Sequence, residues 1–317
     1  MGNIKARLYY LSMLAFLCLL TACAAPGVRE ATKHSQLPRR AELIQTPFFP
    51  QEQYQCGPAA LATALTAVNI SVTPEQLTPE VYVPSRQGSL QIEMLAAARR
   101  HGAVSVQIPP KLEAIMQEIA AGHVVVVMQN LGFSWIPSWH YAVVVGYDAD
   151  KELVWLRSGP YKRQEMSLSA FQRTWARSEH WAFVALPPGQ LPVSVEADEI
   201  AKALVAYEKN APAPARKTAY YAAVQQWPDH LVLLIGLGNA AYATGDLPLA
   251  ASSFKHATEV RPESAAAYNN LANVLLAQKQ FIQAESAATK GLTLAGENEK
   301  LKSQITQTLL EIRQQKK

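Results

Sequence analysis

The chain has 317 residues, of which 49% are hydrophobic and 17% are charged, and this length allows about two folded domains. Its formal net charge at pH 7 is +4, with basic residues scattered along the chain, which argues against a nucleic-acid-binding protein. The sequence contains no metal-ligand spacing, phosphate-binding loop or dinucleotide-binding fingerprint, so we expect neither a metal nor another cofactor.

The N-terminal residues 1–22 have the features of a secretory signal peptide. A short basic head that contains Lys5 and Arg7 is followed by the apolar run 8–20 and by small residues before Cys23. The run is shorter than the roughly 20 apolar residues of a membrane-spanning helix. Without this segment, the net charge of the chain falls to about +2.

The stretch Leu20-Thr21-Ala22-Cys23 resembles the bacterial lipobox. This resemblance implies that Cys23 becomes the lipid-modified first residue of the mature chain; the alternative is an ordinary signal with an incidental cysteine. Because Ala24 follows, it also implies a place in the bacterial cell envelope, at the outer membrane and facing the periplasm. Residues 23–45 are polar and interrupted by prolines, which predicts a tether between the lipid and a folded domain.

Cys56 is the cysteine that processing would leave unmodified, because Cys18 lies in the signal peptide and Cys23 would carry the lipid. A disulfide within the mature chain is then impossible, and an unpaired thiol in an oxidising compartment suggests a reactive cysteine. A small buried apolar cysteine is the alternative interpretation.

Residues 46–187 alternate between helix-like and strand-like segments, which predicts an α+β domain. The spacing of apolar residues predicts helices at 57–68, 90–100 and 111–121. Runs rich in β-branched and aromatic residues predict strands at 104–108, 124–129, 141–147, 153–157 and 180–185.

Cys56 directly precedes the helix that Gly57 and Pro58 are expected to begin. A helix N-terminus favours negative charge, so we expect this position to lower the pKa of the thiol and to activate it as a nucleophile. A cysteine nucleophile also needs a base. The histidines of the domain are His101, His123, His140 and His180. His140, at the start of the valine-rich run 141–147, is the first candidate, and His123, before residues 124–127, is the main alternative.

The motif QCGPAAL around Cys56, together with the motif HYAVVVGYD that starts at His140, resembles the papain-like bacteriocin-processing cysteine peptidases, which remove double-glycine leader peptides. The resemblance is greatest to their stand-alone relatives without transporter domains, and it covers about residues 45–187. It implies a papain-like fold, Cys56 as the nucleophile and His140 as the general base.

The family also uses a glutamine five or six residues before the cysteine to stabilise the oxyanion. This implies that role for Gln51, with Gln53 and Gln55 as alternatives. The aromatic and proline residues that flank the two motifs could line an apolar substrate cleft, or they could pack in the core or within the loops. They are Pro47, Phe48, Phe49, Trp135 and Trp139.

A third family residue, an aspartate after the next strand, orients the histidine, and Ser158 stands at that place in LRSGP. A serine can accept a hydrogen bond from imidazole but cannot stabilise imidazolium as a carboxylate does. Asp148 and Asp150 lie in the expected turn between the two strands, where we expect them to form the turn.

Beyond the proline-rich linker 188–194, residues 195–317 predict an all-α tetratricopeptide-repeat solenoid. Leu237-Gly238-Asn239 aligns with Leu271-Ala272-Asn273 at an offset of 34 residues, a period that resembles this repeat. We expect repeats at 195–228, 229–262 and 263–296, with a capping helix at 298–314 and a surface that binds a protein partner.

The sequence therefore predicts a lipid-anchored cysteine peptidase that acts on a peptide or protein and binds a protein through its repeats. The first alternative is a scaffold lipoprotein whose papain-like domain has lost catalysis. A second alternative is a transglutaminase-like or deamidating activity of the same cysteine and histidine.

Overall fold

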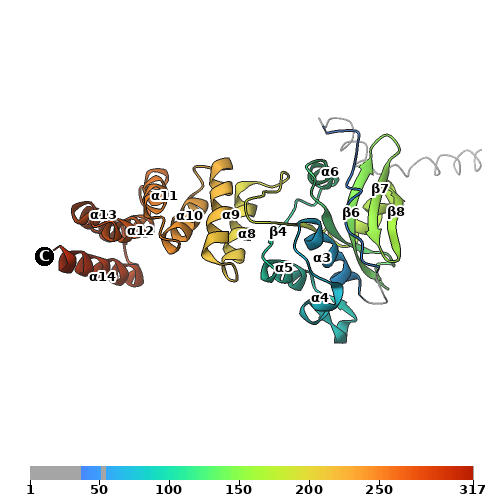
Figure 1. Ribbon diagram of the computed structural model, residues 1–317, viewed down its shortest axis with the longest axis horizontal. Helices are drawn as coiled ribbons and strands as arrows, with labels where there is room; N and C mark the ends of the chain where they lie inside the picture. Colours follow the sequence, from blue (N-terminus) through green and yellow to red (C-terminus); the bar gives the residue numbers. More distant parts are fainter. Residues whose placement is uncertain (1–36, 51–54, 317) are drawn as a thin grey trace, which may run out of the picture.

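The computed structural model describes residues 37–50 and 55–316, so the expected signal peptide and the expected lipidation site Cys23 lie outside the described residues. In the described part, a sheet domain comes first, and a row of helices extends from it to the C-terminus (Figure 1). Every helix in these two ranges is too short or too polar to cross a membrane.

The sheet domain is built on one antiparallel sheet of seven strands, in the order β4-β9-β5-β6-β7-β8, with β1 paired to one end of β6. Its strands are β1 (Arg40–Glu42), β4 (Val104–Gln107), β5 (Val125–Asn130), β6 (Trp139–Asp148), β7 (Leu153–Ser158), β8 (Tyr161–Ser167) and β9 (Ala182–Leu186). A separate short ladder pairs β2 (Tyr82–Val83) with β3 (Gly88–Ser89).

Five α-helices cover the two faces of this sheet. They are α3 (Cys56–Ala67), α4 (Pro74–Val81), α5 (Gln91–Arg100), α6 (Leu112–Ala120) and α7 (Leu168–Ala176), with a 3-10 turn at Pro84–Arg86. Tyr141, Val143 and Val145 of β6 pack in the hydrophobic cluster with α3, α4 and α5. The alternate residues Ala142 and Val144 pack in the cluster with α6 and α7. Because helices cover both faces of the sheet, the side chains on both sides of β6 are apolar, and its sequence is a continuous apolar run.

The predicted elements of the domain largely match the observed ones. All three expected helices and all five expected strands are present, within a few residues at their ends. Six elements besides the 3-10 turn were not expected: β1, α4, β2, β3, β8 and α7. Strand β8 (YKRQEMS) has few apolar residues because it lies at the edge of the sheet with one side exposed. The strand β1 falls within the expected tether 23–45, so the sheet domain begins earlier than the predicted boundary at 46.

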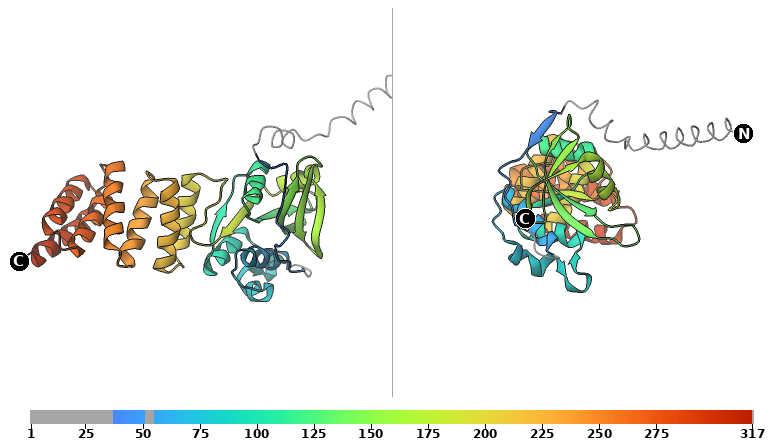
Figure 2. Two further views of the ribbon diagram at one scale, coloured as in Figure 1. Left: turned by 45° about the horizontal axis from the view of Figure 1, so that its top comes forward. Right: turned by 90° about the vertical axis from the view of Figure 1, so that its right-hand side faces the viewer.

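The second part of the chain is a solenoid of paired helices. They are α8 (Ala197–Glu208), α9 (Ala213–Gln226), α10 (Leu231–Ala243), α11 (Leu247–Val260), α12 (Ala265–Ala277), α13 (Phe281–Leu294) and the final α14 (Glu299–Gln315). The first helices of the pairs begin at 197, 231 and 265, and the second helices at 213, 247 and 281, so the period is 34 residues throughout. Figure 2 shows these helices stacked side by side. The predicted fold class is thereby confirmed.

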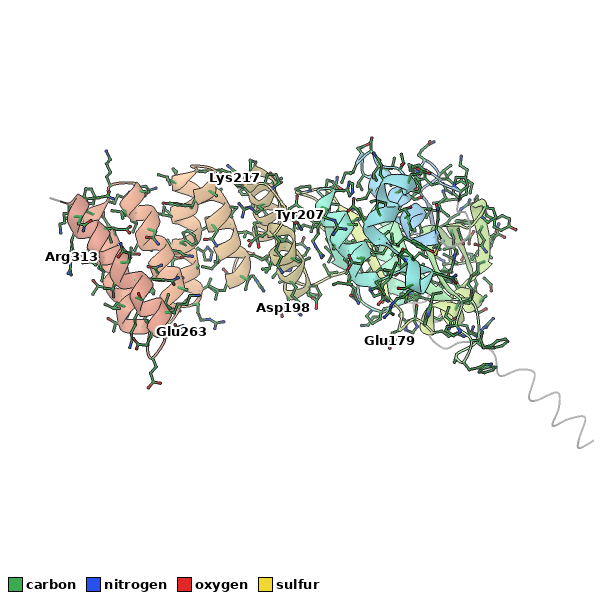
Figure 3. The ribbon with its side chains drawn as sticks, turned by 90° about the horizontal axis from the view of Figure 1, so that it is seen from below. Glu179, Asp198, Tyr207, Lys217, Glu263 and Arg313 are labelled. Carbon is green, nitrogen blue, oxygen red and sulfur yellow. The ribbon has the colours of Figure 1, made fainter. Side chains whose placement is uncertain are left out.

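The two parts are packed against each other, although the connecting segment reads as a linker. Helix α8 lies against β4, and one hydrophobic cluster continues from the sheet through α8, α9 and α10. The Tyr207 hydroxyl, at the boundary between the two parts (Figure 3), donates a hydrogen bond to the Gly102 carbonyl at 3.1 Å.

A buried carboxylate holds the connecting segment itself. Glu118 of α6 is fully buried, and its Oε1 accepts hydrogen bonds from the Val193 and Ser194 backbone amides at 2.9 and 2.8 Å and from the Ser194 hydroxyl at 2.6 Å. Its Oε2 contacts Nδ1 of His123 at 2.7 Å. Because a buried carboxylate needs such partners, the hydrogen bonds of Glu118 with Val193 and Ser194 fix the start of the repeats on the sheet domain.

Candidate active site

Cys56 is the first residue of α3, as its sequence context predicts. Gln55 is the N-cap, and the Ala59 amide donates to the Gln55 carbonyl at 3.2 Å in the first turn. Pro58 fits this turn because the missing N–H would have had no partner there. Cys56 is a free cysteine and is partly buried against the cluster that α3 forms with the sheet.

Two opposing effects act on the pKa of Cys56. Burial is the larger effect and raises the pKa above its ordinary value of 9.0, while hydrogen bonds from the backbone amides of Tyr141, Gly57 and Cys56 itself lower it. The net direction is opposite to the predicted lowering, which is therefore wrong. The helix start does supply stabilising amides, but the apolar surroundings of the sulfur outweigh them.

The start of β6 meets the end of β7 at a pair of polar side chains. His140 Nε2 lies 2.8 Å from Ser158 Oγ, within hydrogen-bond distance. Ser158 is buried, and His140 is half-buried, with burial lowering the pKa of its imidazole below 6.5. When Nε2–H of the neutral ring donates to Ser158, the other ring nitrogen, Nδ1, carries a lone pair and can accept a proton.

The backbone of β6 links the thiol to this histidine. The Tyr141 amide that donates to the Cys56 sulfur belongs to the residue directly after His140, so α3 begins beside the start of β6. The Tyr141 ring packs edge-on against Trp181, and its hydroxyl donates to the Ser89 carbonyl at 3.1 Å. Burial and the nearby Cys56 raise the pKa of this phenol. Tyr141 is thus held from both ends next to the thiol.

Ser89 packs against Gly57 in the first turn of α3. A Cβ atom at Gly57 would lie 2.2 Å from Ser89 Oγ, so glycine is required there by close packing. The Ser89 hydroxyl is buried and has no hydrogen-bond partner among the described residues. The contact between Gly57 and Ser89 therefore sets the position of the first turn of α3.

A buried arginine outside the predicted site residues holds the segment before the cysteine. Arg157 Nη2 donates to the carbonyls of Ile44 and Thr46 at 3.0 and 3.1 Å, and Nη1 donates to the Lys162 carbonyl. Arg157 is 4% exposed. The only sequence signal was a charge inside the apolar strand LVWLRS, which is typical of an arginine that satisfies buried carbonyls.

The other candidate histidines lie apart from Cys56. His123 is bound to Glu118 beyond the end of β5 that pairs with Val144, whereas His140 pairs with Gln129 near the other end of β5. His101 is the C-cap of α5 and contacts Glu80 at 2.8 Å. His180 precedes β9 and packs edge-on against Trp175.

The two candidate aspartates form the turn between β6 and β7, as predicted. Asp148 Oδ1 accepts hydrogen bonds from the backbone amides of Asp150 and Lys151 at 3.1 and 2.9 Å. Asp150 forms an exposed ion pair with Arg39. This turn lies at the end of β6 farthest from His140, so neither aspartate reaches the imidazole.

Two of the three candidate glutamines, Gln51 and Gln53, lie outside the described residues. Gln55 is the N-cap of α3, and its side chain makes no capping hydrogen bond. Among the aromatic candidates, Phe49 packs partly against the α3 cluster. Trp135 and Trp139 are 75% and 52% exposed, so neither packs in the core. Trp135 stacks on Phe133 within its loop, which agrees with the loop-packing alternative. Pro47 and Phe48 are half-buried.

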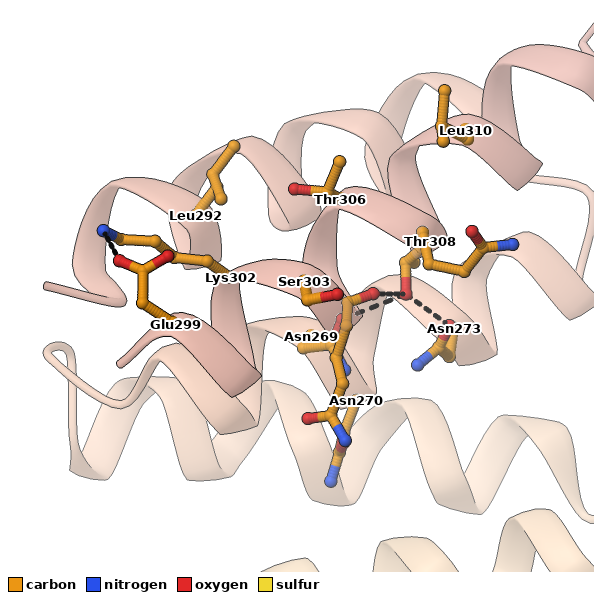
Figure 4. A pocket seen from close by; sticks show the side chains of 12 residues that line it. Asn269, Asn270, Asn273, Leu292, Glu299, Lys302, Ser303, Thr306, Thr308 and Leu310 are labelled. Atoms are coloured by element: carbon orange, nitrogen blue, oxygen red, sulfur yellow. Dashed lines mark hydrogen bonds and ion pairs between the residues drawn. The ribbon is translucent and has the colours of Figure 1, made fainter. Parts of the chain in front are cut away.

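The repeats carry a polar pocket between α12 and α14 (Figure 4), with a volume of about 980 Å³. Amide and hydroxyl side chains dominate its lining, among them Asn269, Asn273 and Gln307. The Thr308 hydroxyl lies 3.1 and 3.2 Å from the amide oxygens of Asn269 and Asn273. Such side chains can hydrogen-bond a polypeptide backbone, which has both donors and acceptors.

Comparisons with known proteins concern each part of the chain separately. No curated protein gives a significant match. Among solved structures, the chain is similar to a C39-like peptidase from Bacillus anthracis at 16% identity and a TM-score of 0.40, over 46% of this chain and 97% of that one. A double glycine motif protease from an AMS/PCAT transporter, solved with the leader peptide, gives 20% identity and a TM-score of 0.35 over 45% and 93%. The TPR2B domain of yeast Sti1, in a pHsp70 complex, gives 21% identity and 0.36 over 38% and 97%.

A family model matches the sequence of the sheet domain. Residues 43–183 match the Peptidase_C39 like family, a range that contains Cys56, His140 and Ser158 and ends within β9. Over this range, the sheet domain is similar to the Peptidase_C39 like family.

Proposed function

We propose that this protein is a lipid-anchored cysteine peptidase that hydrolyses a peptide bond through Cys56 and His140. The observation that carries the proposal is the hydrogen bond from the Tyr141 amide to the Cys56 sulfur. It brings the free thiol at the start of α3 to the residue that follows His140, whose ring is held by Ser158 at 2.8 Å.

The proposed reaction is acyl transfer in two stages. The Cys56 sulfur attacks the carbonyl carbon of the scissile bond while Nδ1 of His140 takes the thiol proton. The tetrahedral intermediate collapses, the C–N bond breaks, and the imidazolium gives the proton to the leaving amine. Water then attacks the thioester with His140 as the base, which releases the acid and restores the thiol.

The negative charge of the intermediate needs hydrogen-bond donors aimed at its oxygen. The backbone amides at the start of α3 point toward the sulfur and lower its pKa, which makes them suitable donors. We assign Gln51, five residues earlier in the chain, as the side-chain donor.

In this scheme Ser158 is a positioning residue. It accepts the Nε2 proton and so fixes both the tautomer and the orientation of His140. A serine brings no charge, and the imidazolium is therefore less stable here than beside a carboxylate. The lowered pKa of His140 agrees with this account. We expect catalysis from a neutral thiol and a neutral imidazole rather than from a resting ion pair.

The remaining features assign a place and a partner. We propose that Cys23 carries a lipid that anchors the protein at the bacterial outer membrane, facing the periplasm. The repeats then bind a protein partner, for which the polar pocket between α12 and α14 is suited. Replacement of Cys23 by serine should abolish incorporation of radioactive palmitate in a bacterial host and release the protein from the membrane fraction.

The peptidase activity is tested by comparing the full chain with its Cys56→Ala and His140→Ala variants on a bacterial envelope proteome. New N-termini are identified by mass spectrometry. His256→Ala is the matched control, because His256 lies on α11 and pairs only with exposed Asp229 among the described contacts. We expect cleavage with the wild type and the control and none with the other two variants. The same fragments from all four proteins would refute the peptidase and leave the scaffold as the function.

A further inference from the structure

Six large apolar side chains are exposed around one end of the sheet. We call them the apolar rim, and they are Leu131, Phe133, Trp135, Ile136, Trp139 and Tyr161. Their exposed fractions range from 48% to 75%. Soluble proteins rarely expose such a concentration of apolar surface without a binding function.

The topology of the sheet places this rim beside the candidate active site. The loop 131–138 connects β5 to β6, and Trp139 pairs with Asn130 while the next residue, His140, pairs with Gln129. On the other side, Ser158 pairs with Tyr161 across the turn from β7 to β8. Both connections lie at the same end of the four neighbouring strands β5, β6, β7 and β8, so the rim borders the contact between His140 and Ser158.

Buried polar contacts hold the loop of the rim in one shape. Asn130 is 2% exposed, and its Oδ1 accepts hydrogen bonds from the Gly132 and Ser138 amides at 3.0 and 2.9 Å. Arg177 donates to the Gly132 carbonyl at 2.6 Å. A Cβ atom at position 132 would lie 2.4 Å from the Ile136 carbonyl oxygen, so the tight path of the loop requires glycine.

The tip of the loop is closed by its own backbone and by an aromatic pair. Phe133 and Ile136 exchange two backbone hydrogen bonds at 3.1 and 3.3 Å. The Phe133 and Trp135 rings stack with their centroids 4.9 Å apart. The exposed side chains are therefore presented in a fixed arrangement, and binding to them costs little conformational entropy.

We infer that the apolar rim binds large apolar side chains of the polypeptide substrate next to the scissile bond. The inference rests on the proposed peptidase function and names the substrate class: polypeptides with bulky aliphatic or aromatic residues beside the cleaved bond. The rim is continuous with His140 through Trp139 and with Ser158 through Tyr161, so a chain lying across the site contacts it.

A lipid bilayer is a less suitable occupant than a polypeptide. The described chain enters the sheet through β1, which pairs with Gly146, Tyr147 and Asp148. These residues lie at the end of the ten-residue strand β6 opposite Trp139, about 23 to 30 Å away at the rise of a strand. The described chain therefore enters the sheet domain at the end remote from the rim.

The test measures peptide binding and cleavage preference with the full chain. The variant is Trp135→Ser, because Trp135 is 75% exposed and its removal leaves the core intact. Trp135→Phe is the conservative rescue, and Ile282→Ser is the matched control, since Ile282 is 74% exposed on the distant helix α13. A peptide library made from an envelope proteome serves as the ligand, and cleaved bonds are read by mass spectrometry.

We expect the wild type to prefer bonds flanked by large apolar residues. Trp135→Ser should lower kcat/KM for these peptides about tenfold and leave peptides without such residues unchanged. Trp135→Phe and Ile282→Ser should retain the preference. An unchanged preference in Trp135→Ser would overturn the inference and leave the peptidase function intact.

Binding is measured separately in the Cys56→Ala background, so that loss of catalysis does not obscure the result. Immobilised Cys56→Ala protein should retain apolar peptides, and Cys56→Ala/Trp135→Ser should not. Equal retention by both would overturn the inference whether or not the wild type cleaves. A Trp135→Ser variant that loses only binding to phosphatidylglycerol vesicles, or only a dimer in light scattering, would instead assign the rim to a membrane or to a second copy.

Discussion

At the level of single residues, the thiol and the imidazole are both shifted toward their neutral forms. Burial raises the pKa of Cys56 and lowers that of His140. The two shifts share one cause, the burial of both groups at the start of α3 and β6. They widen the pH range in which the thiol holds its proton and the imidazole can accept it.

We therefore predict a broad pH profile of kcat/KM for peptide hydrolysis. The acidic limb should fall below pH 6.5, because a lowered pKa keeps His140 neutral until the pH drops under that value. The basic limb should lie above pH 9.0, because a raised pKa keeps the Cys56 proton in place up to that point. Alkylation of Cys56 by iodoacetamide, followed by mass spectrometry, should also accelerate only above pH 9.0. Rapid alkylation near pH 6 would contradict the neutral pair.

The contact between His140 and Ser158 gives a second prediction. Ser158→Ala should lower kcat for peptide hydrolysis about tenfold or more, because Nε2 loses the partner that fixes the ring. KM and the iodoacetamide reactivity of Cys56 should stay the same, which separates positioning from a loss of folding. Ser158→Thr, which keeps the hydroxyl, should recover part of kcat. Equal kcat values for the wild type and Ser158→Ala would remove Ser158 from the mechanism.

The packing of Gly57 on Ser89 can be tested with a pair of substitutions. Gly57→Ala should lower the free energy of unfolding by about 1–3 kcal/mol, because the new methyl group overlaps Ser89. Gly57→Ala/Ser89→Gly should recover most of this loss, since the second change removes the overlapping atoms. Denaturant unfolding provides the values. A double variant no more stable than Gly57→Ala would show that the contact does not set the helix start.

At the level of secondary-structure elements, strand β7 does more than complete the sheet. Its last two residues serve two purposes, since Ser158 contacts His140 and Arg157 binds the carbonyls of the segment before α3. Helix α3 and strand β6 alone would leave that segment without a partner for these carbonyls. The strand therefore connects the position of the imidazole with the path of the chain toward Cys56.

Arg157→Met should lower the free energy of unfolding by about 2–4 kcal/mol, because it leaves buried carbonyls without their charged donor. Arg261→Met is the control. Arg261 pairs only with exposed Glu263 among the described residues, and its loss should cost at most about 1 kcal/mol. Urea unfolding of both variants measures the difference. Similar values for the two would contradict a supporting role for Arg157.

At the level of the whole molecule, the sheet domain and the repeats form one unit. One hydrophobic cluster runs from β4 and β9 into α8, α9 and α10, so the core of the sheet domain is continuous with the core of the first repeats. Glu118 adds a polar contact that fixes the segment at Val193 and Ser194. A partner bound to the repeats is consequently held in a defined position relative to Cys56.

The wild type should accordingly unfold in one calorimetric transition and resist proteolysis at residues 188–194. Glu118→Ala should lower the free energy of unfolding by about 3 kcal/mol. It should also expose that segment, which contains no lysine or arginine, to cleavage by thermolysin. Glu113→Ala, on the exposed side of the same helix, should cost at most about 1 kcal/mol. Two separate transitions in the wild type would show that the domains fold independently.

Much of this architecture was accessible from local sequence patterns. The start of α3 at Cys56 followed from Gly57 and Pro58, and the strand β6 from its valine run, because both depend on neighbouring residues. The helix pairs of the repeats followed from the 34-residue period. Strand β8 was missed because an exposed edge strand contains few apolar residues. Strand β1 was missed because three residues are too few to show a periodicity.

The chemistry of the site depended instead on contacts between residues far apart in the chain. The helix position of Cys56 suggested a lowered pKa, whereas burial against the sheet raises it. The roles of Arg157 and Glu118 and the exposure of Trp135 likewise arise from what the folded chain covers or leaves open. Periodicity and capping are properties of adjacent residues and are visible in a sequence. Burial and desolvation are properties of the assembled core, and they exist only once the distant strands and helices have met.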